Sequence, residues 1–153
     1  MKTKWTFEDV YDQFLTYTAS CTLSVLTDEE IKNELDKMLL RALSEFMFPQ
    51  VSLDYETDPE TNITSFVDKD FGLREIAVII AYMKKYYHEW MLSKESNFQQ
   101  QYYDSDTRTH SQANMVKQLL DSYKEATAAA EAANRNYLRM DNKRKARIGA
   151  VNA

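Results

Sequence analysis

The stretch from Arg74 to Leu92 reads REIAVIIAYMKKYYHEWML and predicts the central helix of a mainly helical protein. Its large apolar side chains recur three and four positions apart, which is the spacing of the buried face of a helix. They are Ile76, Ile79, Ile80, Met83, Tyr87 and Trp90. Ala77 and Ala81 are small enough to let a second helix approach closely. We therefore expect a helix over about 73–93 that buries this face.

Three further segments have a helical pattern. Residues 7–18 form the first, with a weak capping arrangement at its start. The second opens with a capping box of Thr27 and Glu30 and stops before Pro49. Its apolar stripe consists of Ile31, Leu35, Met38, Leu39, Ala42 and Phe46. The last covers about 109–141 and is rich in alanine in its second half, so it either packs tightly against a neighbour or projects from the body.

Residues 50–67 change from the helical period to an alternation of apolar and polar side chains. The turn sequence TDPETN separates two arms, which predicts a small β-hairpin. The apolar faces are expected to contain Val51, Leu53 and Tyr55 in the first arm and Ile63, Ser65 and Val67 in the second. Because an isolated two-stranded hairpin is marginal in water, it must lie on the helices or find a strand from another subunit.

The chain has 153 residues, which suits one domain with a substantial core. Only two glycines and two prolines occur, and this disfavours folds that need many tight turns. The predicted fold is mainly α, a bundle of three to four helices with a β-hairpin insertion at about 50–67. Residues 1–141 form the single helical domain, and 142–153 form a basic C-terminal tail that is flexible until assembled.

The net charge of −5 is unevenly distributed along the chain. The tail carries four cations and no acid, which leaves 15 basic against 24 acidic residues, or −9, in residues 1–141. Such a bipolar chain suits head-to-tail or side-by-side self-assembly, or a tail that reaches an acidic partner. Four cations without interleaved aromatic residues are a weak signal for nucleic-acid binding. A disordered terminus and a tail that orders only on assembly both remain open.

No motif in the sequence predicts catalysis, a metal or a cofactor. The letters HEW at His88 begin a zinc-protease motif, but Leu92 stands where the second histidine is needed. Asp104 and Asp106 begin a calcium-like loop that lacks the glycine and glutamate required further on. Cys21 is the only cysteine, which excludes an intramolecular disulfide. The apolar run IAVIIAYM is too short to span a membrane, so we expect a soluble protein that is not an enzyme.

The order of these segments resembles a known family. A well-capped helix, a β-like insert and REIAVIIAYMKKYYHEWML are followed by HSQANMVKQLLDSYKEA and a late NRNYLRM. This arrangement, from Thr27 to Tyr137, resembles small virion proteins of tailed bacteriophages, the neck or head–tail connector (adaptor) family. The matching positions are Glu75, Ile76, Ile80, Ala81, Met83, Trp90, Ser111, Ala113, Asn114, Leu119 and Tyr137. The chain departs from the pattern where a Thr or Asp cap is expected, because Asp70-Phe71-Gly72 precedes the central helix.

The resemblance implies a structural role without catalysis or cofactor. Such proteins form an oligomeric ring, typically of twelve copies, below the portal, and join the DNA-filled head to the tail. Its implied partners are other copies of the chain, the portal protein, other neck or tail proteins, and passing double-stranded DNA that is not bound sequence-specifically. The implied location is the neck of the virion, after synthesis in the host cytoplasm, with no membrane involved.

The candidate interface residues come from the hairpin, the late tyrosine and the tail. A hairpin can add to a neighbour's sheet, and the tail would reach the portal or the next subunit. The candidates are Val51, Leu53, Tyr55, Ile63, Val67, Tyr137, Lys143, Arg144, Lys145 and Arg147. The alternative function is a non-catalytic helical interaction module, such as a phage assembly factor or a host-protein binder.

Overall fold

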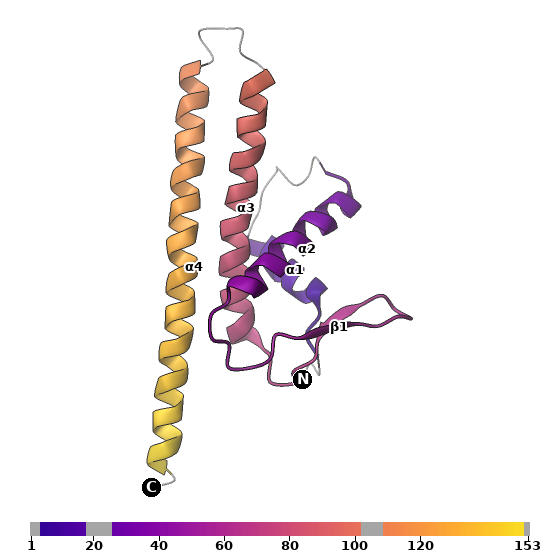
Figure 1. Cartoon of the computed structure of the whole chain (residues 1–153), viewed down its shortest axis with the longest axis vertical. Coiled ribbons are helices and arrows are strands. Elements are labelled where there is room, and N and C mark those ends of the chain that lie inside the picture. The colour runs from indigo at the N-terminus through magenta and orange to yellow at the C-terminus, as the bar shows by residue number, and fades with distance from the viewer. Residues whose placement is uncertain (1–3, 18–25, 102–108, 152–153) are drawn as a thin grey trace.

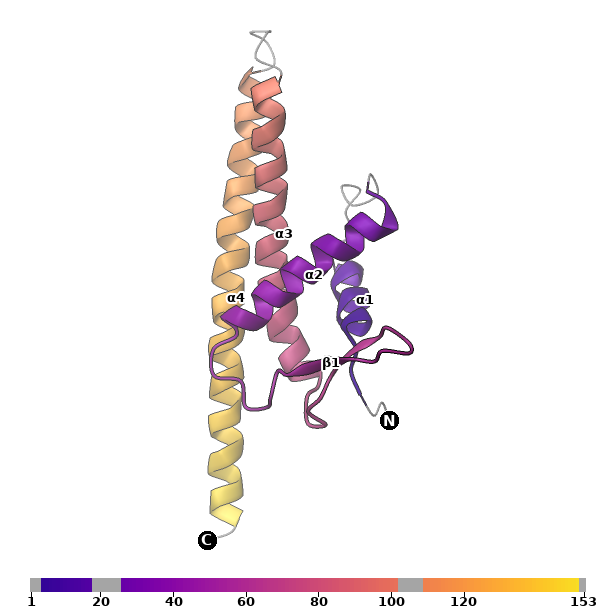
Figure 2. The same ribbon diagram turned by 45° about the vertical axis from the view of Figure 1, so that its right-hand side comes forward.

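The structure, a computed structural model, describes residues 4–17, 26–101 and 109–151. Its elements are α1 (Phe7–Tyr17), α2 (Asp28–Glu45), β1 (Tyr55–Thr57), β2 (Thr64–Phe66), α3 (Leu73–Gln101) and α4 (Thr109–Val151). The long helices α3 and α4 run antiparallel side by side, while α1, α2 and the hairpin gather around the first half of α3 (Figures 1 and 2). The predicted helical bundle with a hairpin between its second and third helices is confirmed. Cys21, Asp104 and Asp106 lie outside the described residues.

The first two helices begin at reciprocal caps, as the sequence predicts. Before α1, the Thr6 amide donates to Asp9 Oδ2 at 2.8 Å, and the Asp9 amide donates to Thr6 Oγ1 at 3.2 Å. Before α2, the Thr27 amide donates to Glu30 Oε2 at 2.9 Å, and the Glu30 amide returns a bond to Thr27 Oγ1 at 3.3 Å. These bonds satisfy backbone amides that have no partner inside the helix.

Helix α3 is capped by Glu75, although no Thr or Asp stands at the expected cap position. Glu75 Oε2 accepts from the backbone amide of Gly72 at 3.0 Å, which is one half of a capping box. The helix then continues to Gln101, so the expected end near residue 93 is wrong. The polar stretch after Ser96 was expected to be a loop, but residues 97–101 contain no glycine or proline, and their three glutamines favour helix.

The basic C-terminal segment is also helical. The expected end of the last helix near Asp141 is wrong, because α4 continues to Val151 and the domain boundary at 141/142 falls inside a helix. Lysine, arginine and alanine dominate the segment 143–147, and all three favour helix. This end of α4 extends past the start of α3 (Figures 1 and 2). That the segment is flexible before assembly stays a prediction.

Helix α3 is buried on more than the one face predicted from its periodicity. The expected core positions from Ile76 to Tyr87 are buried, and Trp90 is partly buried. Val78, Tyr82 and Tyr86 are buried as well. The reason is that α3 contacts α1, α2 and α4 at once, so several of its faces are covered.

The second arm of the hairpin turns a different face inward than the alternation predicted, whereas Val51 and Leu53 of the first arm pack against the core as expected. Strand β1 pairs antiparallel with β2, with Tyr55 opposite Phe66. Phe66 is only 1% exposed and stacks on Phe71 with ring centroids 3.8 Å apart, whereas Val67 is 48% exposed. The expected inner face through Ile63, Ser65 and Val67 is therefore wrong by one residue. A one-residue shift exchanges the two faces of a strand, and burial of the Phe66 ring decides which of them faces the helices.

Neighbouring substitutions in β2 test this assignment. We expect Phe66→Ala to lower the free energy of unfolding by about 3–5 kcal/mol, because it leaves a cavity between Phe7 and Phe71. Val67→Ala is the matched control and should change it by no more than about 0.5 kcal/mol, since the side chain is half exposed. Urea unfolding followed by circular dichroism measures both. Equal effects of the two substitutions would contradict the assignment.

Candidate interaction surfaces

The connection between α2 and β1 is fastened to α4 by two buried side chains, which we call the Asn134–Tyr137 latch. Asn134 Oδ1 accepts from the Met47 amide at 3.1 Å, and its Nδ2 donates to the Met47 carbonyl at 3.2 Å. The Tyr137 hydroxyl accepts from the Gln50 amide at 3.1 Å and donates to Glu75 Oε1 at 2.8 Å. The latch thus joins α4, the α2–β1 connection and the start of α3.

Burial keeps the latch in one protonation state. It raises the pKa of Tyr137 to about 12, and the bond to Glu75 acts in the same direction, while the bond from the Gln50 amide opposes it. The hydroxyl therefore remains protonated at neutral pH and continues to donate to Glu75. Arg74 lies over the Tyr137 ring, 5.0 Å from its centroid. Because Tyr137 is only 4% exposed, it belongs to the interior of its own chain, which corrects its expected place at an interface with a partner.

The latch also presents an apolar pair that the sequence pattern did not predict. Met47 and Phe48 are both exposed, Phe48 at 69%. Phe48 has a φ of 54°, in the left-handed region that bulky side chains seldom adopt. The predicted apolar stripe of α2 ended at Phe46 and did not include Met47 and Phe48. Pro49 was the available signal for their exposure, because helices usually end before a proline. Helix α2 ends at Glu45, and the two side chains that follow Phe46 lie at the surface.

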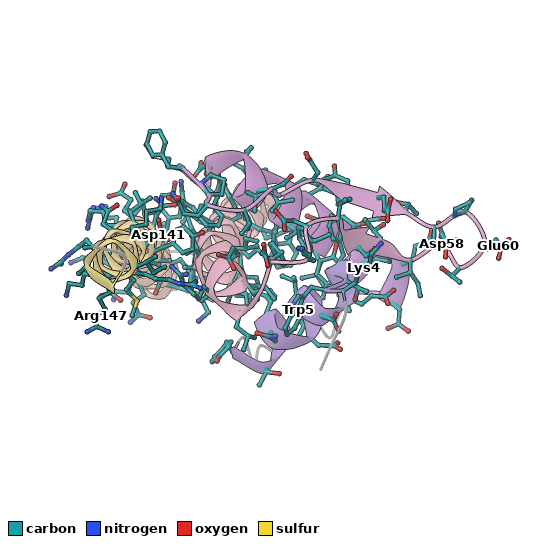
Figure 3. The ribbon with its side chains drawn as sticks, turned by 90° about the horizontal axis from the view of Figure 1, so that it is seen from below. Lys4, Trp5, Asp58, Glu60, Asp141 and Arg147 are labelled. Carbon is teal, nitrogen blue, oxygen red and sulfur yellow. The ribbon has the colours of Figure 1, made fainter. Side chains whose placement is uncertain are left out.

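One edge of the hairpin is covered by the chain's own N-terminal segment. The Phe66 amide donates to the Trp5 carbonyl at 2.9 Å, and Thr6 forms a β-bridge with Ser65. The Lys4 Nζ atom pairs with Glu56 Oε1 at 2.7 Å, and Figure 3 shows Lys4 and Trp5 beside the hairpin. Within the described residues, only the β1 edge of the hairpin is left for pairing with another strand. A strand from a neighbouring subunit could therefore add to the hairpin only at β1.

The five hairpin candidates fall into two groups. Val51 and Leu53 are partly buried and pack against the core, so they hold the first arm on its own body. Tyr55, Ile63 and Val67 are exposed. The exposed group is the part of the hairpin that is accessible to a partner.

The four cations of the tail lie on the last turns of α4 and are all exposed. Lys145 is the only one tied to its own body in the described part of the chain. Its Nζ lies 2.9 Å from Asp141 Oδ2 and donates to Gln50 Oε1 at 2.7 Å. Lys143, Arg144 and Arg147 form no ion pair within the described residues. They leave a positive surface at this end of the helix.

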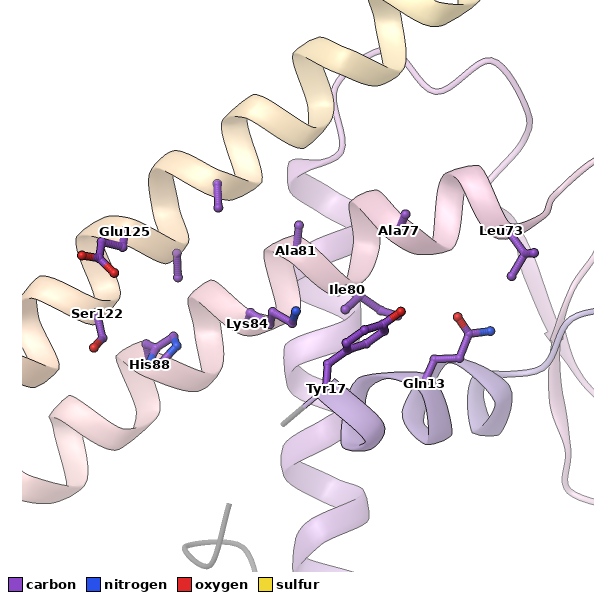
Figure 4. Close-up of a pocket in the computed structure, with 12 residues that line it drawn as sticks. Gln13, Tyr17, Leu73, Ala77, Ile80, Ala81, Lys84, His88, Ser122 and Glu125 are labelled. Atoms are coloured by element: carbon purple, nitrogen blue, oxygen red, sulfur yellow. The ribbon is translucent and has the colours of Figure 1, made fainter. Parts of the chain in front are cut away.

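An open groove of about 760 Å³ lies between the end of α1 and the facing sides of α3 and α4 (Figure 4). His88 projects into it from α3, opposite Ser122 and Glu125 of α4. These residue types can form a nucleophilic relay, but within the described residues no hydrogen bond joins them and His88 Nδ1 has no partner. Burial lowers the pKa of His88, while Glu125 acts in the opposite direction. The groove is therefore lined by a mixture of apolar and polar side chains, and its histidine is biased toward the neutral form.

The described residues contain no group of three or more His, Cys, Asp or Glu side chains that could hold a metal ion. None of the described helices is long and apolar enough to cross a membrane. Comparison with protein families, with curated proteins and with solved structures gives no match for this chain.

Removing one hydroxyl tests the latch. We expect Tyr137→Phe to lower the free energy of unfolding by about 1–3 kcal/mol, because Glu75 Oε1 and the Gln50 amide lose their partner in a buried place. Tyr123→Phe on the same helix is the matched control and should cost clearly less, since that residue is only partly buried. Denaturant unfolding measures both variants. Equal losses of stability would contradict the two buried hydrogen bonds assigned to the Tyr137 hydroxyl.

The lowered pKa of His88 gives a pH dependence with a definite sign. Below its usual pKa of about 6.5 the unfolded chain takes up a proton that the folded chain resists, so stability falls with pH through the folded pKa. We expect a loss of at most about 1.4 kcal/mol per pH unit between pH 7 and 5. His88→Gln should remove this part of the slope. Unfolding curves at several pH values measure it, and identical slopes for both proteins would contradict the prediction.

The acidic side chains do not obscure this window. Glu30, Glu45, Asp58 and Asp68 have pKa values lowered from ordinary values of 4.5 or 3.8. Their contribution to stability is therefore lost only at lower pH.

Proposed function

We propose that this chain is a structural virion protein of a tailed phage. It forms an oligomeric ring, with twelve copies as the expected number, that joins the portal of the DNA-filled head to the tail and surrounds the passing DNA. In this role it has no catalytic activity and needs no cofactor. Its partners are other copies of itself, the portal protein and further neck or tail proteins.

The observation that carries the proposal is the hydrogen bond between Glu75 and Tyr137. Both residues belong to the sequence pattern that resembles the connector family, although they lie 62 positions apart. Their side chains meet at 2.8 Å inside the latch, where α3, α4 and the α2–β1 connection come together. Two positions of the pattern thus serve one structural purpose, which supports a common architecture behind the resemblance.

The distribution of charge supports a role around DNA. Residues 1–141 carry a net charge of −9, and a wall of this sign repels the phosphate backbone. A duplex that is not held by the wall slides through the ring. The exposed side chains of the hairpin and of the end of α4 supply surfaces for contacts between subunits and with the portal.

The proposal is tested by adding the purified chain to isolated portal rings and to DNA-filled heads of the phage that encodes it. We expect an added ring below the portal in electron micrographs, and the chain in finished particles by mass spectrometry. Light scattering after size-exclusion chromatography gives the number of copies bound to each portal.

Two controls make the result decisive. Portal rings without the chain give the background, and Phe66→Ala, which disturbs the core, shows that binding requires the folded chain. A chain that stays monomeric with portal rings and with heads, and is absent from finished particles, contradicts the connector role. That outcome would favour a non-catalytic interaction module instead.

A further inference from the structure

The hairpin carries a concentration of negative charge. Residues 54–68 contain five acids, Asp54, Glu56, Asp58, Glu60 and Asp68, and no lysine, arginine or histidine. The first four are exposed. Asp58 accepts from the amide of Glu60 at 2.8 Å, which shapes the tip, while Glu60 itself remains free to meet a partner through its side chain. We call residues 54–68 the acidic hairpin.

The end of α4 carries the opposite charge. Residues 142–151 contain four cations and no acid, and they lie beyond the start of α3 in both views of the fold (Figures 1 and 2). Lys143 and Arg147 are four positions apart and therefore lie on one face of the helix. Met140 and Ile148 are exposed beside them. We call residues 140–148 the cationic helix end.

The two charged surfaces lie on opposite sides of the molecule when it is viewed along its long axis (Figure 3). In Figure 3, Asp58 and Glu60 mark one extreme and Arg147 marks the other, with the body of the protein between them. They cannot meet within one chain in this arrangement. Two copies placed side by side in the same orientation would bring the acidic hairpin of one toward the cationic helix end of the next.

We propose that the acidic hairpin of one copy docks on the cationic helix end of the neighbouring copy. The proposal rests on the proposed function, and it names the contact that joins adjacent subunits of the ring. Because two different surfaces of the chain meet, the contact is heterologous, and repetition with a closing rotation produces a ring.

The two surfaces match in more than charge. Tyr55 and Ile63 are exposed on the hairpin, and Met140 and Ile148 are exposed on the helix end, so both surfaces combine apolar area with charge. Apolar side chains contribute affinity as they are buried, and complementary charge sets the orientation and speeds association. The hairpin is anchored by Phe66, and the helix end is anchored by the latch before it and by the bonds of Lys145, which limits the ordering that docking requires.

A second copy suits the cationic helix end better than a nucleic acid does. The helix end has no exposed aromatic side chain for stacking on bases, and it belongs to a chain with a net negative charge. The acidic hairpin offers a compact counter-surface with a similar number of opposite charges, and it is present at equal concentration whenever the chain is made. Binding of the helix end to DNA is the alternative that the experiment below distinguishes.

Charge reversal in two places provides the test. The hairpin variant is Glu56→Lys with Glu60→Lys, which leaves the Asp58 turn intact and removes the exposed Lys4–Glu56 ion pair. An exposed pair of this kind contributes little to stability. The helix variant is Lys143→Glu with Arg147→Glu, which leaves the bonds of Lys145 intact. Each variant alone should reduce the number of copies assembled on portal rings, with assembly about ten-fold weaker, because attraction becomes repulsion at two positions.

Complementary variants should assemble again. In an equal mixture, the hairpin and helix variants can alternate around an even-numbered ring, so that every contact pairs opposite charges. The chain with all four substitutions should also recover. Lys117→Glu with Lys124→Glu, at exposed positions of α4, is the matched control and should assemble like the wild type. Thermal unfolding by circular dichroism verifies that each variant is folded.

The possible outcomes separate this contact from the proposed function. If the wild type assembles on portal and both reversed variants assemble equally well, the contact is wrong while the connector role stands. The contact is also wrong if the variants fail but neither the mixture nor the fourfold variant recovers. Loss of binding to a duplex oligonucleotide by the helix variant, with normal ring assembly, assigns the helix end to DNA. If the wild type itself does not assemble, both proposals fail.

Discussion

The hydroxyl of Tyr137 is the point on which the arrangement of the long helices depends. It accepts from the backbone of Gln50 and donates to Glu75, and it thereby joins three segments that are distant in the sequence. The middle of α4, residues 126–133, is rich in alanine and offers little apolar area for packing. Directional bonds from Asn134 and Tyr137 therefore fix the register of α4, which packing of alanines alone would define poorly.

The latch also determines what the surface presents. Because Asn134 holds both backbone groups of Met47, the connection between α2 and β1 cannot relax toward the interior, and Phe48 remains exposed with a left-handed backbone. Elsewhere in the domain, burial of Phe66 determines which face of the hairpin packs against the helices. The acidic hairpin and the cationic helix end are thus held apart by bonds and packing inside the domain, which favours contacts of each with a different molecule.

The features that the sequence predicted correctly are those that depend on contacts between residues close together in the chain. The capping box at Thr27 and the helical periods required only contacts three or four positions apart, and the structure confirms them. The predicted inner face of β2 was wrong, because the face is chosen by the contact of Phe66 with Phe7, which lies far earlier in the sequence, and by its stacking on Phe71. Asn134 was missed for a similar reason. A polar residue on an apolar stripe was visible, but its partner Met47 lies 87 positions away.

The helix dipole is the first local explanation to consider for the charge at the end of α4. Cations near the C-terminal end of a helix stabilise it through this dipole. This effect falls off within the last turn of a helix. Lys143, Arg144 and Arg147 all lie before the last turn of α4, which contains no basic residue, and none of the three has an ion-pair partner within the described residues. Their charge is therefore not explained by the stability of the helix alone, whereas it is explained if an acidic surface of another molecule rests there.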